Sequence, residues 1–441
     1  MRYWLLIIFI YSYPSISAQS NWEPLITDDQ LSNFQKLNGS ADYVYVEGVL
    51  TGITRHYSPN TFLATTAFYD DFILEFEVKI EQGMNSGVQI RSENHIGSGS
   101  VHGYQVKIET SDRKWAGGIY DEGRRGWMYP LSQSKTSQNA FKNDTWNTYR
   151  IEAVGPSVKT YVNGIPCAHL VDDWTSKGFI AFQVHSIGAE EKAGKIVQWR
   201  NIRILTEDIE KDLWTKGDVE EISYLDNRLT QNEIQNGWQL LESDDWQLNN
   251  KNGKAGSDSM VNNGIVSVDK KGAVNIVSVE QFSDFEFSVD FKVEKGNESG
   301  ILYLTNPEAN NPKHELQGLK YQIVDDTYHP DSHFDKKRYN KVGDLFDLIP
   351  AKNLTESNIA DIRYKSGQYN RARIKVTDGK VEHWLNDIKI LEYDLRSPIF
   401  KSLLLKAGYK DHPGFDQDGS GHIVLQASQG VLFKNMKIRQ L

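Results

Sequence analysis

The amino-acid sequence predicts an all-β protein made of two tandem β-sandwich, or jelly-roll, domains joined by a short helical linker. The apolar segments are short, rich in Val, Ile, Phe and Tyr, and alternate with period two between Gly, Asn, Asp and Pro. This pattern is typical of antiparallel strands with tight turns. Roughly ten or more such segments, with almost no helical periodicity, favour a fold of two packed sheets.

The second observation behind this prediction is an internal duplication, in which six blocks recur in the same order. The interval from Trp146 to Asn163 equals that from Tyr369 to Asn386. We therefore expect copy one at 19–206, a linker at 207–236 and copy two at 237–441. The matched blocks are WEPL with WQLL, NSGVQIR with ESGILYL, GYQVKIE with KYQIVDD, WNTYRIEAVGPSVKTYVNGI with YNRARIKVTDGKVEHWLNDI, GFIAFQ with GHIVLQ, and WRNIRI with FKNMKI.

The linker and the N-terminus carry short signals of their own. Thr230 with Glu233 three residues later fits a helical capping box. Residues 1–18 combine Arg2, an apolar run and the small-residue stretch SISA, which predicts a secretory signal cleaved after Ser17 or Ala18. The alternative is a buried N-terminal strand. We expect a protein exported to the periplasm or beyond the cell.

Composition excludes several classes of function. The chain of 441 residues has a net charge of −10 at pH 7, which disfavours nucleic acid as a partner. No further stretch approaches the roughly 20 apolar residues of a membrane-spanning helix, so membrane insertion is not expected. Cys167 is the single cysteine, so an intrachain disulfide is impossible, and we expect this side chain to be buried.

The segment GGIYDEGRRGWMYPL, residues 117–131, is unusually rich in charged and aromatic groups for a turn. A solvated turn needs glycine and a few polar side chains, but gains little from a tryptophan or from two adjacent arginines. The composition favours a surface that binds something polar and flat, such as a sugar ring.

Strand alternation predicts which polar side chains of copy one share a face. Gln89 and Arg91 lie on one side of their strand, as do Gln105, Lys107 and Glu109, and then Gln183 and His185. If these strands are neighbours in one sheet, their polar sides converge on a single surface. Solvent exposure would also explain a polar face, but Gln, Arg and His are less usual there than Lys, Glu and Thr.

Copy two differs at the matching positions, where Leu302, Leu304 and Ser428 replace Gln89, Arg91 and His185. Its polar groups gather in DDTYHPDSH and around Lys341, and they could bind a ligand or a cation. The stretch DQDGSG favours a plain turn over a calcium loop. The candidate residues of copy two are Gln322, Asp325, His329, Asp331, Asp344, His383 and Gln426.

Several motifs together resemble the 3-keto-disaccharide hydrolase family. In copy one these are NSG, GYQV, GGIYDEGRRGW, WNTYRI with YVNG, FQVH and WRNIRI; in copy two they are YQIVDDTYHPD, LFDLIPA, VEHWLN, GHIVLQ and FKNMKI. The resemblance covers nearly all of residues 20–441. It implies concanavalin- or laminin-G-like sandwiches and a glycoside or oligosaccharide substrate whose C3 hydroxyl has become a ketone. That ketone acidifies the C2 hydrogen, so a base can remove it, the C1 substituent can leave, and water can add back.

The resemblance also suggests roles, since such a route needs a base, an acid and positive charge or donors at the enolate oxygen. His185 or Glu109 is expected as base and Asp121 or Glu122 as acid. Arg91 with Arg124 or Arg125 is expected at the oxyanion, although a divalent metal could replace the arginines; no cofactor is otherwise implied. The expected substrate-binding residues are Gln89, Gln105, Lys107, Tyr120, Arg125, Trp127 and Gln183.

The sequence departs from the family pattern in copy two. A glutamate is usual at the position of Lys320, an Asp-His pair at Ala427 and Ser428, and an acid at Lys107 of copy one. We therefore expect copy one to carry any reaction. The competing interpretations are a lyase that stops before hydration, a non-catalytic lectin-like binder, and a structural or cell-surface interaction module.

Overall fold

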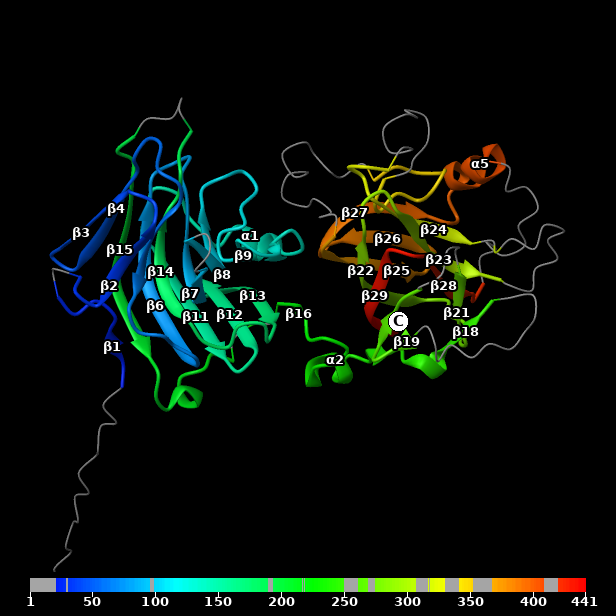
Figure 1. Ribbon diagram of the computed structural model, residues 1–441, viewed down its shortest axis with the longest axis horizontal. Coiled ribbons are helices and arrows are strands. Elements are labelled where there is room, and N and C mark those ends of the chain that lie inside the picture. Colours follow the sequence, from blue (N-terminus) through cyan, green and yellow to red (C-terminus); the bar gives the residue numbers. More distant parts are fainter. Residues whose placement is uncertain are drawn as a thin grey trace, which may run out of the picture.

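The computed structural model describes most of both copies. The described residues are 21–28, 31–95, 99–188, 193–215, 217, 219–249, 261–268, 274–306, 316, 318–329, 341–351, 367–407 and 419–441. Two β-sandwiches lie side by side, with the segment that links them between the two (Figure 1). The predicted export signal, residues 1–18, falls outside the described part.

Copy one packs two sheets face to face, antiparallel throughout except for the edge strand β16. The first has the order β16-β13-β12-β11-β6-β15-β4-β3, with β1 also paired to β15, and the second has the order β10-β9-β8-β7-β14-β5-β2. The strands are β1 Glu23–Pro24, β2 Phe34–Asn38, β3 Asp42–Val46, β4 Val49–Ile53, β5 Thr61–Thr65, β6 Phe72–Ile80, β7 Asn85–His95, β8 Ser100–Glu109, β9 Ile119–Glu122, β10 Gly126–Tyr129, β11 Asn147–Val154, β12 Ser157–Val162, β13 Ile165–Val171, β14 Phe179–Val184, β15 Ile196–Leu205 and β16 Glu221–Ser223.

Copy two repeats this plan. Its sheets have the orders β19-β20-β29-β22-β25-β26-β27, with β17 on β29, and β18-β21-β28-β23-β24. The strands are β17 Gln239–Leu240, β18 Trp246–Leu248, β19 Val261–Asn262, β20 Ile265–Val266, β21 Val274–Ser278, β22 Phe285–Val293, β23 Glu298–Thr305, β24 Leu319–Val324, β25 Tyr369–Thr377, β26 Lys380–Leu385, β27 Ile388–Asp394, β28 His422–Ala427 and β29 Val431–Gln440.

The duplication extends to individual contacts. β1 pairs with β15 in copy one, and β17 pairs with β29 at the same place in copy two. The Asn163 amide donates to Asn147 Oδ1 at 2.8 Å, and the Asn386 amide donates to Asn370 Oδ1 at 3.1 Å. The all-β fold of two tandem sandwiches is thus confirmed.

The core of each copy lies between its two sheets, as the alternation of apolar residues requires. Trp199 and Tyr149 are fully buried in copy one, where Tyr149 stacks on Phe76 with ring centroids 5.2 Å apart. Cys167 is also buried there, as predicted, and burial raises the pKa of its thiol to about 12. Copy two is filled in the same way by residues such as Phe285 and Tyr303.

The linking segment is bound to both copies. Its strand β16 pairs in parallel with β13, so it extends a sheet of copy one. Glu220 accepts from the Tyr129 hydroxyl at 2.6 Å through its carbonyl, and its carboxylate lies 3.2 Å from Arg373 of copy two. The predicted capping box of Thr230 and Glu233 is confirmed.

The helices are few and short among the described residues. None of those helices is both long and apolar enough to cross a membrane. They are α1 Lys135–Gln138, the 3-10 turn η1 Ile209–Lys211, α2 Gln231–Gln235, the 3-10 turn η2 Ser243–Asp245 and α5 Pro398–Lys406.

Candidate functional site

The second sheet of copy one places several of the predicted residues in one row. Ala181 of β14 lies opposite Gln89 of β7, Gln89 lies opposite Gln105 of β8, and Gln105 lies opposite Tyr120 of β9. Directly opposite residues project from the same side of a sheet, and so do residues two apart on a strand. We call this surface the polar face. It comprises Gln89, Gln105, Lys107, Tyr120, Glu122 and Gln183.

Glu122 is the carboxylate of the polar face. Its two oxygens accept from the Asn60 amide at 3.4 Å and from the Gln105 amide at 3.2 Å. The other end of the Gln105 amide accepts from Lys107 Nζ at 2.9 Å. Burial raises the pKa of Glu122, and this effect outweighs the opposing influence of Lys107 and the two amides. A carboxyl group in this setting holds its proton more readily than an exposed one.

His185 follows directly after β14 and lies close to the same network. The Ser186 amide donates to Asn60 Oδ1 at 2.9 Å, and Asn60 is the residue that donates to Glu122. The His185 Nδ1 atom lies 2.7 Å from the Ser186 carbonyl oxygen. Because a carbonyl can only accept, Nδ1 carries the proton in the neutral ring, and Nε2 is then the basic nitrogen.

Two glutamines of the polar face have polar atoms with no partner within the described part of the chain. Gln183 Nε2 and Oε1 are both buried without a hydrogen-bond partner, and so is Gln89 Oε1. A buried polar atom left without a hydrogen bond costs roughly 1–3 kcal/mol, so such atoms are usually satisfied by water or by a ligand. They make the polar face a candidate for binding hydroxyl groups.

Residues 117–131, which form one continuous segment in the sequence, contribute side chains to two different surfaces. Asp121 lies opposite Tyr104, on the other side of β9 from Tyr120 and Glu122. It is fully buried and pairs with Arg124 Nε at 2.7 Å and Arg125 Nε at 2.6 Å. Asp121 and the two arginines therefore stabilise the β9–β10 hairpin on the side of the sheet opposite the polar face.

Arg125 extends this network to the first sheet of copy one. It makes a two-pronged contact with Asp172 at 3.0 and 2.6 Å, and Asp172 also accepts from the Tyr104 hydroxyl. The two acids raise the pKa of Arg125 against the effect of burial. Arg124 donates to the Thr175 hydroxyl at 2.6 Å.

Glu109 and Trp127 stabilise the base of the hairpin. Glu109 accepts from the Trp115 amide at 2.8 Å and pairs with Arg113. Although burial favours the neutral acid, the contacts with Arg113 lower the pKa of Glu109 overall. Trp127 is only 6% exposed and packs edge to face against Trp115, at 4.7 Å between ring centroids, and Tyr120, at 5.5 Å. Trp127 pairs with Tyr120 across the hairpin and so projects from the side of the polar face, but both its ring and the Glu109 carboxylate are buried.

Arg91 points away from the polar face because a β-bulge interrupts the alternation. The register of β7 on β8 shifts between Ile90 and Glu93, and Arg91 has a φ of +44°. Its guanidinium donates to the Asp70 and Gly155 carbonyls at 2.7 and 2.6 Å and to the Asp71 carboxylate at 2.9 Å. Arg91 therefore joins two loops at the end of the sandwich.

In the described part of copy two, Gln322, Gln426 and Lys320 share one face of the second sheet. Both glutamines lie beside Gly300, because Gly300 pairs with Gln322 and a Cβ atom there would stand 2.9 Å from Gln426 Oε1. The Gln322 amide donates to Glu298 at 3.2 Å. Lys320 is largely buried nearby, and burial lowers its pKa.

The acidic candidates of copy two mainly organise loops. Asp325 accepts from the Gly296 and Thr327 amides at 2.8 and 3.1 Å, and Asp344 accepts from the Lys341 and Ala351 amides at 2.8 and 2.7 Å. Their neighbour Asp326 has its pKa raised to about 7 by burial. The His329 amide closes a turn onto the Asp325 carbonyl at 3.0 Å. Asp331 lies outside the described residues.

His383 lies in the core of copy two. Its Nδ1 atom is 2.8 Å from the Gly343 carbonyl, and its Nε2 atom is 2.7 Å from the Tyr303 hydroxyl. Burial lowers the pKa of His383 to about 4. The ring is thus a neutral member of a buried hydrogen-bonded cluster.

Metal ligands are not grouped in the part of the chain that the structure describes. There, no set of three or more His, Cys, Asp and Glu side chains is arranged to hold an ion. The sequence reasoning did not single out Asn60, although this residue connects Glu122 with the segment after His185. A lone asparagine in a Pro-Asn turn gives no signal of such a role.

Comparisons with known proteins agree with this architecture. The model of the 3-keto-alpha-glucoside-1,2-lyase-like domain matches residues 21–205 and again residues 232–439. The chain belongs to this family. Both copies carry the family domain, and the two matches leave residues 1–20, 206–231 and 440–441 outside.

A curated relative and two solved structures show how far the likeness extends. A 3-keto-disaccharide hydrolase of Bacteroides thetaiotaomicron is 27% identical over 193 residues, which is 38% of this chain and 62% of that protein. A structure assigned as a glycosyl hydrolase from Parabacteroides distasonis is 24% identical, with a TM-score of 0.41, and covers 49% of this chain and 99% of its own. A Bacillus subtilis protein with a galectin-like fold is 12% identical, with a TM-score of 0.32, over 42% of this chain and 94% of its own.

Proposed function

We propose that the protein is an exported enzyme that cleaves 3-keto-glycosides by elimination, and that the polar face of copy one is its active site. The observation that carries this proposal is Glu122. Its carboxyl group has a raised pKa, and it lies in one hydrogen-bonded row with Gln105 and Lys107. Membership of the 3-keto-α-glucoside-1,2-lyase-like family and the likeness to a 3-keto-disaccharide hydrolase support the choice of substrate.

The reaction needs a base near C2 and an acid near the leaving oxygen. We assign His185 Nε2 as the base that removes the C2 proton, because Nδ1 faces the Ser186 carbonyl. The electron pair forms the enolate, whose negative charge develops on the C3 oxygen. The C1–O bond then breaks, and Glu122 in its protonated form gives its proton to the departing oxygen.

The remaining polar groups stabilise and orient the sugar. Lys107 places a positive charge beside Gln105, where it can stabilise the enolate oxygen. The buried amides of Gln183 and Gln89 would bond sugar hydroxyls. In the hydrolase, water then adds across the C1–C2 double bond, whereas a lyase releases the unsaturated product. A divalent metal bound with the substrate would supply the same stabilisation as Lys107.

Export is proposed from the sequence of residues 1–18, which combine a basic residue, an apolar run and a small-residue cleavage stretch. An enzyme with such a signal would meet glycosides outside the cytoplasm. N-terminal sequencing of the mature secreted protein tests this point, and retention of Met1 would contradict it.

The decisive experiment compares a chromogenic 3-keto-glucoside with its unoxidised parent glucoside, each with and without chelator. Release from the keto compound alone would support elimination, because the parent lacks an acidic C2 hydrogen. Equal release from both would contradict it and favour ordinary glycosidase chemistry. The comparison of the rates with and without chelator decides whether Lys107 acts without a metal.

A His185→Ala variant tests the base. We expect its kcat to fall by roughly 10²–10⁴-fold, the usual contribution of a positioned base, with KM changed far less. The matched control is His56→Ala, an exposed histidine in a loop of the same copy. Equal activity of His185→Ala and the wild type would remove His185 from the mechanism.

A further inference from the structure

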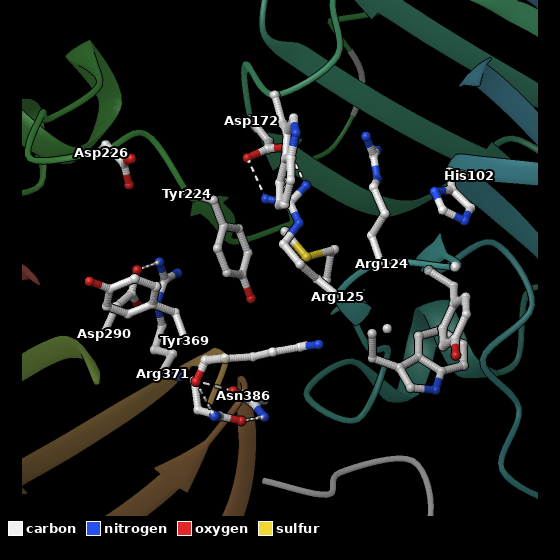
Figure 2. A pocket seen from close by; sticks show the side chains of 18 of the residues that line it. His102, Arg124, Arg125, Asp172, Tyr224, Asp226, Asp290, Tyr369, Arg371 and Asn386 are labelled. Atoms are coloured by element: carbon white, nitrogen blue, oxygen red, sulfur yellow. Dashed lines mark hydrogen bonds and ion pairs between the residues drawn. The ribbon is translucent and has the colours of Figure 1, made fainter. Parts of the chain in front are cut away.

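A large cavity lies between the two copies. Its volume is about 820 Å³, within the range of roughly 300–1,000 Å³ typical of small-molecule sites, which often occur at domain interfaces. Copy one contributes Arg124, Arg125 and Trp174, the linking segment contributes Tyr224, and copy two contributes Tyr369 and Arg371. Figure 2 shows side chains from both copies around this space. We call it the inter-copy pocket.

Aromatic rings are held on both walls of the inter-copy pocket. Trp174 is 59% exposed and Tyr369 is 38% exposed, so both rings are accessible to a ligand. The Arg125 guanidinium carbon lies 4.4 Å from the centre of the Trp174 ring, and Lys434 Nζ lies 4.3 Å from that of Tyr369. Arg371 lies 4.0 Å from the centre of the Tyr224 ring in the same way. Cation–π contacts therefore fix three rings that line one cavity.

The charges that line the pocket are already balanced by one another. Four cations, Arg124, Arg125, Arg371 and Lys434, face five acids, Glu93, Asp172, Asp173, Asp226 and Asp290, so the lining carries one net negative charge when its two histidines are neutral. The main pairs are Arg125 with Asp172 at 2.6 Å, Arg371 with Asp290 at 2.8 Å, and Lys434 with Asp226. Such a lining offers many donors and acceptors but no net attraction for an anion.

We propose that the inter-copy pocket binds a neutral oligosaccharide. Aromatic rings can stack on the apolar faces of sugar rings, and paired charged side chains can exchange hydrogen bonds with hydroxyls without demanding a charged ligand. The pocket borders the polar face at Tyr120, which lines both, but Glu122 is not among its lining residues. Arg124 and Arg125, which do line it, are anchored by Asp121 on the opposite side of β9 from Glu122. Binding there requires no C3 ketone.

The experiment measures calorimetric binding of cellotriose, maltotriose and the anionic trimer of galacturonic acid to the full-length mature protein. We expect saturable binding of at least one neutral trimer and weaker or no binding of the anionic one. Trp174→Ala should weaken neutral binding at least about tenfold, and Trp174→Phe should restore part of it, because a smaller ring still stacks. Tyr57→Ala, which removes an aromatic ring 93% exposed elsewhere on copy one, should leave binding unchanged.

Three outcomes would overturn the proposal. The first is the absence of binding by both neutral trimers, and the second is preferred binding of the galacturonic trimer. The third is neutral binding that survives both Trp174→Ala and Tyr369→Ala but is lost in Glu122→Gln, which would place the ligand on the polar face. Since the probes are unoxidised, none of these results bears on elimination chemistry, which the keto-glucoside assay tests separately.

Discussion

The two copies share their strand order but differ at the strand that follows the polar face. In copy one, β8 is extended by the β9–β10 hairpin, which brings Glu122 and Tyr120 onto that face. In the described part of copy two, β24 is instead flanked by residues 343–349, joined to it through an isolated bridge at Leu345. The same sandwich plan therefore carries the β9–β10 hairpin at this edge in copy one and a differently built segment, residues 343–349, in the described part of copy two.

A second difference lies beneath these edge segments. The Thr160 hydroxyl donates to the Gly117 carbonyl at 2.6 Å in copy one. His383 occupies the matching position in copy two and contacts the Gly343 carbonyl at 2.8 Å. Each copy thus satisfies the same backbone oxygen, but only copy two does so with a group that titrates. The comparison teaches that equivalent architecture can carry different pH behaviour.

The largest effect is expected from a matched pair of carboxylate changes. Glu122→Gln should lower kcat on a 3-keto-glucoside by roughly 10²–10⁴-fold, because glutamine cannot donate the proton that the leaving oxygen needs. Glu298→Gln, which changes the carboxylate bonded to Gln322 in copy two, should leave the rate nearly unchanged. Steady-state kinetics of both variants measures the contrast, and the reverse ranking would assign the reaction to copy two.

The pH profile sharpens this test. Because Glu122 acts as an acid and its pKa is raised, activity should fall as pH increases through that pKa, at a pH above the usual value for glutamate of about 4.3. The alkaline limb should disappear in Glu122→Gln along with most of the rate. An alkaline limb that persists unchanged in the residual activity would belong to another group.

A large loss of stability is expected from Asp121→Asn. The substitution removes the buried charge that faces both Arg124 and Arg125, and breaking a buried ion pair costs roughly 3–5 kcal/mol. Amide hydrogen exchange should show faster opening of β9 and β10 than of β23 and β24. As a control, Asp71→Asn alters a partner of Arg91 that is 47% exposed, so a cost below about 1 kcal/mol is expected. Equal effects would contradict the role of Asp121 as the anchor of the hairpin.

A smaller, pH-dependent effect should distinguish His383 from Thr160. The pKa of His383 is lowered to about 4 in the fold, against about 6.5 for an unfolded histidine. The fold favours the neutral ring, so this contribution is fully present above pH 6.5 and is lost as pH falls towards 4, by up to about 3 kcal/mol. The protection of β25–β27 against hydrogen exchange should therefore decrease in acid more than that of β11–β13. A His383→Gln variant that keeps the same acid sensitivity would contradict this explanation.

The sequence predicted the sandwiches, their duplication and the shared face of Gln89, Gln105, Lys107 and Gln183. These predictions rest on strand periodicity, which depends only on local spacing. The position of Arg91 could not be read in this way, because the β-bulge after Ile90 changes the side towards which the chain projects. A bulge depends on contacts between strands, and it leaves no clear mark in a single sequence.

The 117–131 loop shows a second limit of sequence reasoning. Asp121 and Glu122 are adjacent and chemically alike, but they lie on opposite sides of β9. Their separation follows from alternation only once residues 119–122 are known to form a strand. Trp174 and Tyr369 could not be connected at all, since their proximity depends on how the two copies are placed.

Strand β16 has a consequence for the boundary between the copies. It belongs to the linking segment by sequence, but it covers the outer edge of β13, whose backbone groups would otherwise be open to pairing with another molecule. A copy-one fragment that stops at residue 206 would lack this cover and should self-associate, whereas one continued through Ser223 should remain monomeric. The unit that can be separated and moved into another protein therefore ends about 17 residues beyond the repeat itself, a margin fixed by the parallel pairing of β16 with β13.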